Sequence, residues 1–420
     1  MLLPTATTLH IGVKIKAIRK AKNMTQKQLS KQIPLSQSVI SQIESGNTEC
    51  PPDILRLIKT ALDIENAPLL ESERAIFERR LQYWCDEIRA KRFTNAHEMR
   101  NEMAIILKLP FEKDMAMRYM IFEAKLLILE GNNLGKAAEI LNNAEAAISE
   151  ASEEDRYHFY YAKGLLCLYN QDNKSALDYF IKAEELPYHD TEPSIYYYIA
   201  LCYAKLGKPH HSIRLLEKAS TMVDSERSRM LIDINITLAT NFIHIKQYNK
   251  ANTLLDKCLL DAACIKDTKL YGKTLHNFGY LYQHTNDYSK AIDYFNKAFE
   301  HYGETEWHYL ENAYPMLYCQ AMLNQFDPQD ERYVKACTLA AESDLYRLLF
   351  ESLPVIANLK YINADRLAED IILRLIRMQK YIIALDYCHL LISTYRQRKN
   401  LTRVNIYKAL SADIYVNMIY

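Results

Sequence analysis

The 420-residue sequence is short of glycine and proline, with only 9 Gly and 12 Pro. An average protein contains about 7% glycine. Hairpins between strands depend on residues with positive φ, which glycine adopts most readily. Phosphate-binding turns of dinucleotide and nucleoside triphosphate folds need clustered glycines. The shortage argues against these folds and predicts an all-α protein.

Long apolar runs and paired cysteines are also missing. No apolar run reaches the roughly 18 residues of a membrane span, and MLLPTATTLH has neither the basic start nor the apolar core of a signal peptide. The nine cysteines form no CxxC pair, which argues against metal sites and disulfide frameworks. We expect buried, reduced thiols in a cytoplasmic protein without metal or cofactor.

Catalytic motifs are absent as well. No HExxH, GxSxG, phosphate-loop or paired-carboxylate pattern occurs in the sequence. We therefore expect no catalytic residues and a protein that is not an enzyme.

The formal net charge is zero, but the charges are unevenly distributed. Lys+Arg and Asp+Glu number 52 each. Residues 1–66 hold nine basic and five acidic side chains, which leaves 43 basic and 47 acidic in the remainder. A small basic head thus precedes a larger, mildly acidic body, and neutrality is no argument against binding to nucleic acid.

The head has the pattern of four short helices. Ile11, Ile15 and Ile18 recur at helical spacing, and Thr25 with Gln28 forms a capping box for a second helix, TQKQLSKQI. Ser36 caps a third helix, SQSVISQIE, which Gly46 ends, and a fourth begins at Pro51-Pro52-Asp53. Short helices joined by a tight turn predict a helix-turn-helix.

These residues resemble a known family over about 55 positions. TQKQLSKQI…SQSVISQIESG is similar to the Cro/repressor-type helix-turn-helix, usually called the XRE family. Pro34 departs from the pattern, because the family often has Gly between the two helices. The resemblance implies DNA binding and an internal ion pair between Arg19 and Glu44.

In such domains the start of the third helix enters the major groove. Base contacts are therefore predicted for the exposed face of that helix; the alternative is an ordinary solvent face. Its residues are Gln37, Ser38, Ser41 and Gln42. Phosphate contacts are predicted for Gln26, Asn47 and Thr48. A single head of charge +4 would bind DNA weakly, so we expect a homodimer or higher oligomer.

The body contains an internal repeat. Gly164, Ala176, Phe180 and Ala183 have separations that recur as Gly279, Ala291, Phe295 and Ala298. The equivalents of Ala176 lie 36 to 40 residues apart, at positions 137, 176, 212, 251 and 291. Small residues that let two helices approach, with a large one filling the gap, are the tetratricopeptide pattern.

The predicted architecture follows from these two patterns. We expect a helix-turn-helix domain at 1–66, a linker at 67–72 and a tetratricopeptide domain at 73–420. About eight helix pairs would stack into a right-handed superhelix with a concave binding surface, and 403–420 would close it. HEAT repeats have a similar period but lack the Gly/Ala-Ala-Phe-Ala pattern. The 31 tyrosines would mostly pack between repeats, with a minority on the concave face.

A head of this type followed by such a body resembles the RRNPP family of Gram-positive quorum-sensing regulators. The resemblance implies a cytoplasmic receptor for a short, imported signalling peptide that changes the spacing of DNA-binding heads. Asparagines on inner helices bind the peptide backbone in this family. The matching candidates here are Asn277, Asn235 and Asn312, with His276 and Tyr280 beside Asn277. The alternative for each asparagine is a surface or inter-helix position.

Two other functions remain open. The body could modulate a phosphorelay by binding a response regulator, as the Rap members of the family do. The chain could also be a phage-type repressor without peptide control. The predicted partners are therefore double-stranded operator DNA and a signalling peptide, with a response regulator as the partner in the alternative function. No membrane is expected as a partner.

Overall fold

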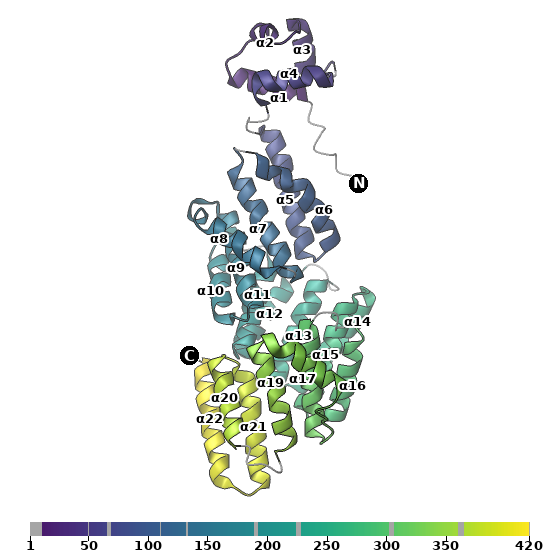
Figure 1. Ribbon diagram of the computed structural model, residues 1–420, viewed down its shortest axis with the longest axis vertical. Coiled ribbons are helices and arrows are strands. Elements are labelled where there is room, and N and C mark those ends of the chain that lie inside the picture. Colours follow the sequence, from purple (N-terminus) through teal and green to yellow (C-terminus); the bar gives the residue numbers. More distant parts are fainter. Residues whose placement is uncertain are drawn as a thin grey trace. The chain divides into compact units, whose positions relative to one another are not determined.

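The computed structural model describes residues 11–48, 50–64, 69–109, 111–131, 133–188, 192–223, 228–301, 306–359 and 365–419. Within these residues every regular element is a helix, and no strand is present (Figure 1). The prediction of an all-α fold is confirmed.

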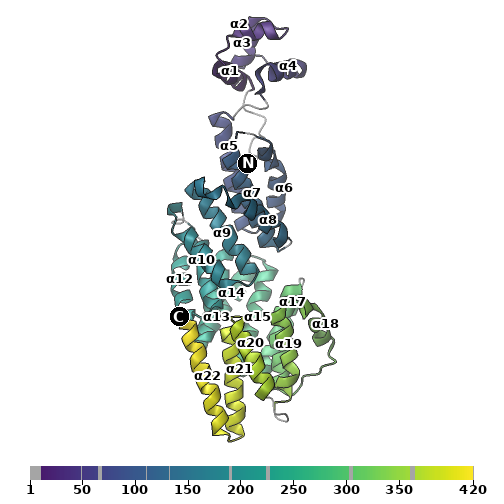
Figure 2. The same ribbon diagram turned by 60° about the vertical axis from the view of Figure 1, so that its left-hand side comes forward.

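Four short helices form the head and surround one apolar core (Figure 2). They are α1 (Ile11–Ala21), α2 (Gln26–Gln32), α3 (Gln37–Ser45) and α4 (Pro52–Leu62). The predicted caps are confirmed: Thr25 and Gln28 make the capping box of α2, and Ser36 caps α3. Gly46 ends α3 at φ 81°, a left-handed conformation that favours glycine. Local sequence rules therefore define this head.

The remaining helices of the described residues form nine consecutive pairs, close to the predicted number of about eight. The first pairs are α5 (Glu71–Arg89) with α6 (Phe93–Met103), α7 (Lys113–Glu130) with α8 (Leu134–Glu145), and α9 (Glu153–Tyr169) with α10 (Asn173–Glu184). They are followed by α11 (Pro193–Lys205) with α12 (Pro209–Thr221), α13 (Arg229–His244) with α14 (Tyr248–Cys264), and α15 (Thr268–His284) with α16 (Tyr288–Phe299). The last are α17 (Glu306–Met322) with α18 (Glu331–Leu339), α19 (Asp344–Ala357) with α20 (Asp365–Arg377), and α21 (Tyr381–Gln397) with α22 (Leu401–Ile419).

Contacts within the pair α15–α16 explain the repeat pattern. Ala291, Phe295 and Ala298 are fully buried. A Cβ atom on Gly279 would lie 2.6 Å from carbons of the Phe295 ring, so only glycine lets α15 approach α16 this closely. The anchor residues at 137, 176, 212, 251 and 291 are all completely buried. The small–large–small spacing therefore marks helix contacts, as predicted.

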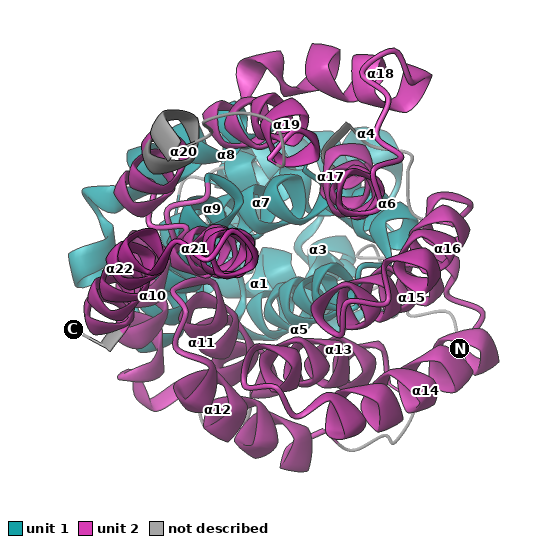
Figure 3. Ribbon diagram, turned by 90° about the horizontal axis from the view of Figure 1, so that it is seen from below, with its two compact units in different colours: residues 1–170 teal, residues 171–420 magenta. Residues whose placement is uncertain are grey.

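The chain forms two compact units, residues 1–170 and 171–420 (Figure 3). In the second unit the helix pairs curve around an interior. Figure 3 shows α11, α13, α15, α17 and α21 on the inner side, and α12, α14, α16 and α22 further out. The predicted boundary at 66 and the linker residues 67 and 68 lie outside the described residues, so the domain boundaries stay predictions.

The cysteines follow the predicted burial only in part. Cys85, Cys202, Cys258, Cys319 and Cys388 are buried, and all nine are free thiols. Cys264 and Cys337 are exposed, because they lie on the outer faces of α14 and α18. Among the described residues, no helix is both long enough and apolar enough to cross a membrane.

Candidate nucleic-acid interface and inner repeat surface

The outer face of α3 is polar and exposed. Gln37, Ser38, Ser41 and Gln42 all lie on this face, while Ile40 and Ile43 are buried on the other side. Apolar anchoring on one side fixes which side chains point outward. The four predicted base-contacting residues are therefore brought together on one accessible surface.

The predicted phosphate-contacting residues lie at the edges of that surface. Asn47 and Thr48 are exposed just after Gly46, and the hydroxyl of Thr48 lies 3.5 Å from Oε1 of Gln42. Gln26 differs from them because its amide is already bonded: Nε2 donates to Oε2 of Glu44 over 2.9 Å. The amide keeps a second hydrogen for a phosphate.

A buried ion pair supports α3 from behind. Arg19 donates from Nε and a terminal nitrogen to the two carboxylate oxygens of Glu44, at 2.6 and 2.8 Å, and also to the carbonyl of Met24. Burial alone would raise the pKa of Glu44, but the hydrogen bonds from Arg19 and Gln26 lower it overall. The expected Arg19–Glu44 pair is present. No sequence motif indicates that Gln26 joins this pair, because the contact depends on how α2 crosses α3.

Two of the inner asparagines have both polar groups bonded. Asn277 donates to the carbonyl of Lys273 and accepts from the hydroxyl of Thr240 on α13, both at 2.8 Å. Asn312 donates to the carbonyl of Phe295 over 3.0 Å and pairs with Nδ1 of His276 at 2.9 Å. Asn312 is fully buried between α16 and α17. A peptide would have to replace these bonds, and most of all at Asn312.

The other predicted peptide contacts are near the same helices. Asn235 lies on α13 and is 7% exposed. His276 and Tyr280 are half-buried on α15, one turn apart, and the Tyr280 hydroxyl lies 3.0 Å from Nε2 of His244. These side chains link α13, α15 and α17 across the inner side of the second unit. Their role toward a peptide stays a prediction.

Further polar groups on α13 and α15 were missed by sequence reasoning. Lys273 pairs with Asp233 over 2.6 Å. Burial lowers the pKa of His244 to about 3 and that of His284 to about 4. Nδ1 of His244 and Nε2 of His284 are buried, and neither has a hydrogen-bond partner among the residues that the structure describes. The inner wall thus contains neutral histidines with unused hydrogen-bonding atoms, which no single-residue motif signals.

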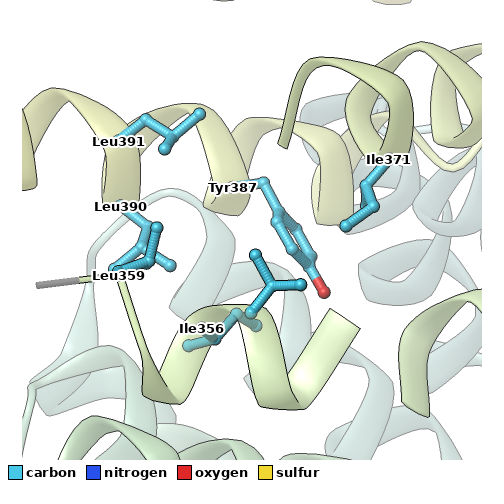
Figure 4. Close-up of a pocket in the computed structure, with 7 residues that line it drawn as sticks. Ile356, Leu359, Ile371, Tyr387, Leu390 and Leu391 are labelled. Atoms are coloured by element: carbon cyan, nitrogen blue, oxygen red, sulfur yellow. The ribbon is translucent and has the colours of Figure 1, made fainter. Parts of the chain in front are cut away.

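A small apolar crevice lies within the second unit (Figure 4). It lies between α19, α20 and α21, and its lining is Val355, Ile356, Leu359, Ile371, Tyr387, Leu390 and Leu391. The hydroxyl of Tyr387 is bonded to Tyr314 and Ser352. With its polar group satisfied, this crevice is a packing gap in the core. In the part of the chain that is described, no group of three His, Cys, Asp or Glu side chains is placed to hold a metal ion.

Comparison with known proteins adds family information to this geometry. Residues 15–65 match the helix-turn-helix family, and residues 272–300 match the tetratricopeptide repeat family. The chain is 23% identical to the transcriptional activator NprA of Geobacillus stearothermophilus over 270 residues, 63% of this chain and 66% of that protein. The chain therefore spans about two thirds of the length of this relative.

Solved structures resemble the fold over most of the chain. A Rap protein complexed with competence and sporulation factor has a TM-score of 0.73, is 18% identical and covers 82% of this chain and 99% of its own. NprR in complex with its cognate peptide NprX has a TM-score of 0.65, is 21% identical and covers 80% of this chain and 98% of its own. The chain therefore shares the helical-repeat fold of these two structures.

The resemblance to RRNPP regulators, and to NprR among them, is thereby confirmed. So is the predicted order of a helix-turn-helix followed by a tetratricopeptide superhelix. At sequence identities below 25%, these similarities show the fold alone. They do not show which ligands or partners this chain binds.

Proposed function

We propose that the chain is a cytoplasmic transcription regulator controlled by a short imported peptide, acting as a homodimer or higher oligomer. The observation that carries this proposal is the exposed polar face of α3 in the same chain as a repeat array with a polar inner wall. The first surface suits DNA and the second suits a peptide backbone. No catalytic role is assigned to any residue.

The DNA-binding step follows from the geometry of α3. Its exposed face enters the major groove, where glutamine pairs with the N6 and N7 atoms of adenine and serine donates or accepts. Gln26, Asn47 and Thr48 then contact phosphates at the edges. Two heads read half-sites about 34 Å apart, so a dimer supplies the affinity that one head lacks.

The peptide acts through the inner wall of the second unit. Asn277 and Asn312 exchange internal hydrogen bonds for bonds to the peptide backbone, and Asn235 also binds that backbone, beside His276 and Tyr280. Because Asn277 bonds Thr240 on α13, this exchange changes a contact between neighbouring inner helices. A ligand shifts an equilibrium only as far as its affinities for the two states differ. In this proposal the two states differ in the hydrogen bond between Asn277 and Thr240.

Selection from a pool of random duplex DNA at fixed salt tests the DNA-binding half. The full chain should enrich a two-half-site sequence, and Gln37→Ala with Gln42→Ala should lose that enrichment. Gln32→Ala, an exposed change on α2, is the matched control. Enrichment of no sequence by the wild type would sink the proposal. DNA binding that no peptide pool alters would indicate a phage-type repressor.

A second candidate function has its own observation. Ile105, Leu107 and Phe111 lie close together in the chain and are 53%, 49% and 59% exposed. Exposed apolar side chains that gather in this way are typical of protein contact surfaces. This candidate is the binding of a phosphorelay response regulator by the first unit. Capture of a purified response-regulator receiver domain by the full chain, and its loss in Leu107→Asp with Phe111→Asp, would support it.

A further inference from the structure

The acidic side chain of Asp386, on α21, has no hydrogen-bond or ion-pair partner among the described residues. Asp386 is half-buried. Burial raises the pKa of Asp386 to about 7. An isolated carboxylate in such surroundings is unfavourable, so its presence needs a reason.

Several other buried acids of this chain are paired with cations. Glu44 binds Arg19, Asp155 binds Arg118 over 2.6 Å, and Asp233 binds Lys273. The chain therefore neutralises carboxylates that serve only its own folding. Asp386 is an exception in the second unit.

The surroundings of Asp386 are rich in tyrosine. Burial raises the pKa of these tyrosines, and the negative charge of Asp386 raises it further. They come from α14, α15, α16, α17, α21 and α22: Tyr248, Tyr280, Tyr288, Tyr314, Tyr318, Tyr387 and Tyr415. The carboxylate is therefore close enough to act electrostatically on side chains from all six of these helices. Tyrosine rings attract cations by their faces, so the wall suits a positive group.

A groove lined by α21 and α22 begins one helical turn along α21 from Asp386, at His389. Its lining is His389, Ile392, Ser393, Arg396, Lys408 and Ser411. Asp386, His389, Ser393 and Arg396 share one stripe of α21, because they are spaced by three or four residues. Arg396 and Lys408 are exposed at the far end. The stripe is thus acidic at Asp386, one turn before the groove begins, and the far end of the groove is basic.

The length of this stripe fits a short peptide. Ten residues separate Asp386 from Arg396, and at 1.5 Å per helical residue they span about 15 Å. An extended chain advances about 3.3 Å per residue, so about five peptide residues cover the same distance. Opposite charges at the two ends also fix the direction in which such a peptide lies.

We propose that a short peptide lies along the α21–α22 groove, with a positively charged group at Asp386 and its terminal carboxylate at Arg396 and Lys408. The proposal rests on the proposed function as a peptide receptor and adds the position, length and charge of the ligand. The positive group is the N-terminal ammonium or a Lys or Arg side chain. Tyr280 lies within the field of Asp386, which connects this groove to the predicted contacts on α15.

The test uses the full chain and synthetic pools of random pentapeptides, with affinity selection read by mass spectrometry. One pool has free ends, one is N-acetylated, one is C-amidated, and each is made with and without Lys and Arg. Retained peptides are resynthesised, and their Kd is measured against wild type, Asp386→Asn and Arg396→Gln with Lys408→Gln. Asp413→Asn is the matched control, an exposed carboxylate on α22.

We expect Asp386→Asn to weaken binding about tenfold or more, the scale of a lost charge-assisted hydrogen bond. Asp386→Glu keeps the negative charge and should therefore bind the retained peptides more tightly than Asp386→Asn does. If the N-terminal ammonium binds Asp386, N-acetylated peptides should bind wild type and Asp386→Asn equally. If a Lys or Arg side chain binds Asp386, peptides without Lys and Arg should show no difference between the two proteins. C-amidation of the peptide should weaken binding, and so should Arg396→Gln with Lys408→Gln. The two changes together should weaken binding no more than either one alone, because both remove the same contact.

Two contrary results are distinguishable. Peptides that bind wild type and Asp386→Asn equally would overturn this inference and leave the proposed receptor function standing. Retention of no peptide from any pool by the wild type would overturn both. Because Asp386→Asn removes an unpaired charge, its thermal midpoint should not fall, which separates lost binding from misfolding.

Discussion

The head and the second unit place buried acids in opposite surroundings. Glu44 in the head is saturated: Arg19 and Gln26 bond its carboxylate, and its pKa is lowered overall. Asp386 in the second unit is surrounded by tyrosines, has no cation partner among the described residues, and its pKa is raised. A carboxylate that is fully paired stabilises a fold, whereas an unpaired one is available to a ligand.

The largest effect should come from breaking the paired acid. The Arg19 and Glu44 side chains are 8% and 1% exposed, so Glu44→Ala leaves a buried guanidinium without its partner. The expected destabilisation of the head is roughly 3 to 5 kcal/mol. Hydrogen exchange of the amides in α1–α4 of the full chain measures this directly.

Acid should have the same effect on the head in the wild type. Since the pKa of Glu44 is lowered in the folded state, the stability it contributes is present above the unfolded pKa and lost as pH falls through the folded one. Exchange in α15–α16 is the internal control. Equal changes in both regions would contradict a role confined to the head.

A smaller effect is expected where a helix pair depends on glycine. Gly279→Ala places a methyl group 2.6 Å from the Phe295 ring, so the ring has to move. Overpacking of this kind costs roughly 1 to 3 kcal/mol. Increased hydrogen exchange in α15 and α16 is the readout.

Gly135→Ala is the matched substitution on α8. A Cβ atom there meets only one side-chain atom, at 4.0 Å, and alanine favours a helix over glycine. This variant should be neutral or more stable. Similar destabilisation by both substitutions would show that close packing is not what selects glycine at 279.

Sequence reasoning succeeded where structure depends on neighbours in the chain. The capping box of Thr25 and Gln28, the left-handed Gly46 and the buried alanine anchors all follow from local spacing. The helices α17 to α20 were harder to predict because they lack those anchors, and Pro315 and Pro354 lie inside α17 and α19. In that region tertiary packing, rather than local pattern, maintains the helices.

Side-chain partners across helices were less accessible to prediction. Gln26 binds Glu44 and Asn312 binds the Phe295 carbonyl because of how helices cross, which spacing along one helix does not reveal. Asp386 was missed for the same reason. Whether Asp386 has a partner among the described residues depends on side chains from six helices, and no sequence motif records that arrangement.

The smallest effect is the pH dependence that Asp386 gives to the second unit. Its folded pKa of about 7 is raised, so between about pH 4 and 7 the folded state holds a proton that the unfolded state has released. Stability therefore falls as pH rises through this window. Asp386→Asn should stabilise the protein at pH 8, by about 1 to 2 kcal/mol after allowance for solvent around a half-buried group, and should have little effect near pH 5.

Thermal unfolding of both proteins at pH 5 and pH 8 measures this difference. The ionisable groups facing Asp386 are its neighbouring tyrosines, from Tyr248 to Tyr415, whose raised pKa keeps them neutral across the window, and His389 stands one turn away on α21. Burial lowers the pKa of His389, so it is also neutral at pH 8. The difference between the two pH values is therefore assigned to Asp386. A variant less stable than wild type at pH 8 would show that the carboxylate has a partner, and the contrast with Glu44 would fail.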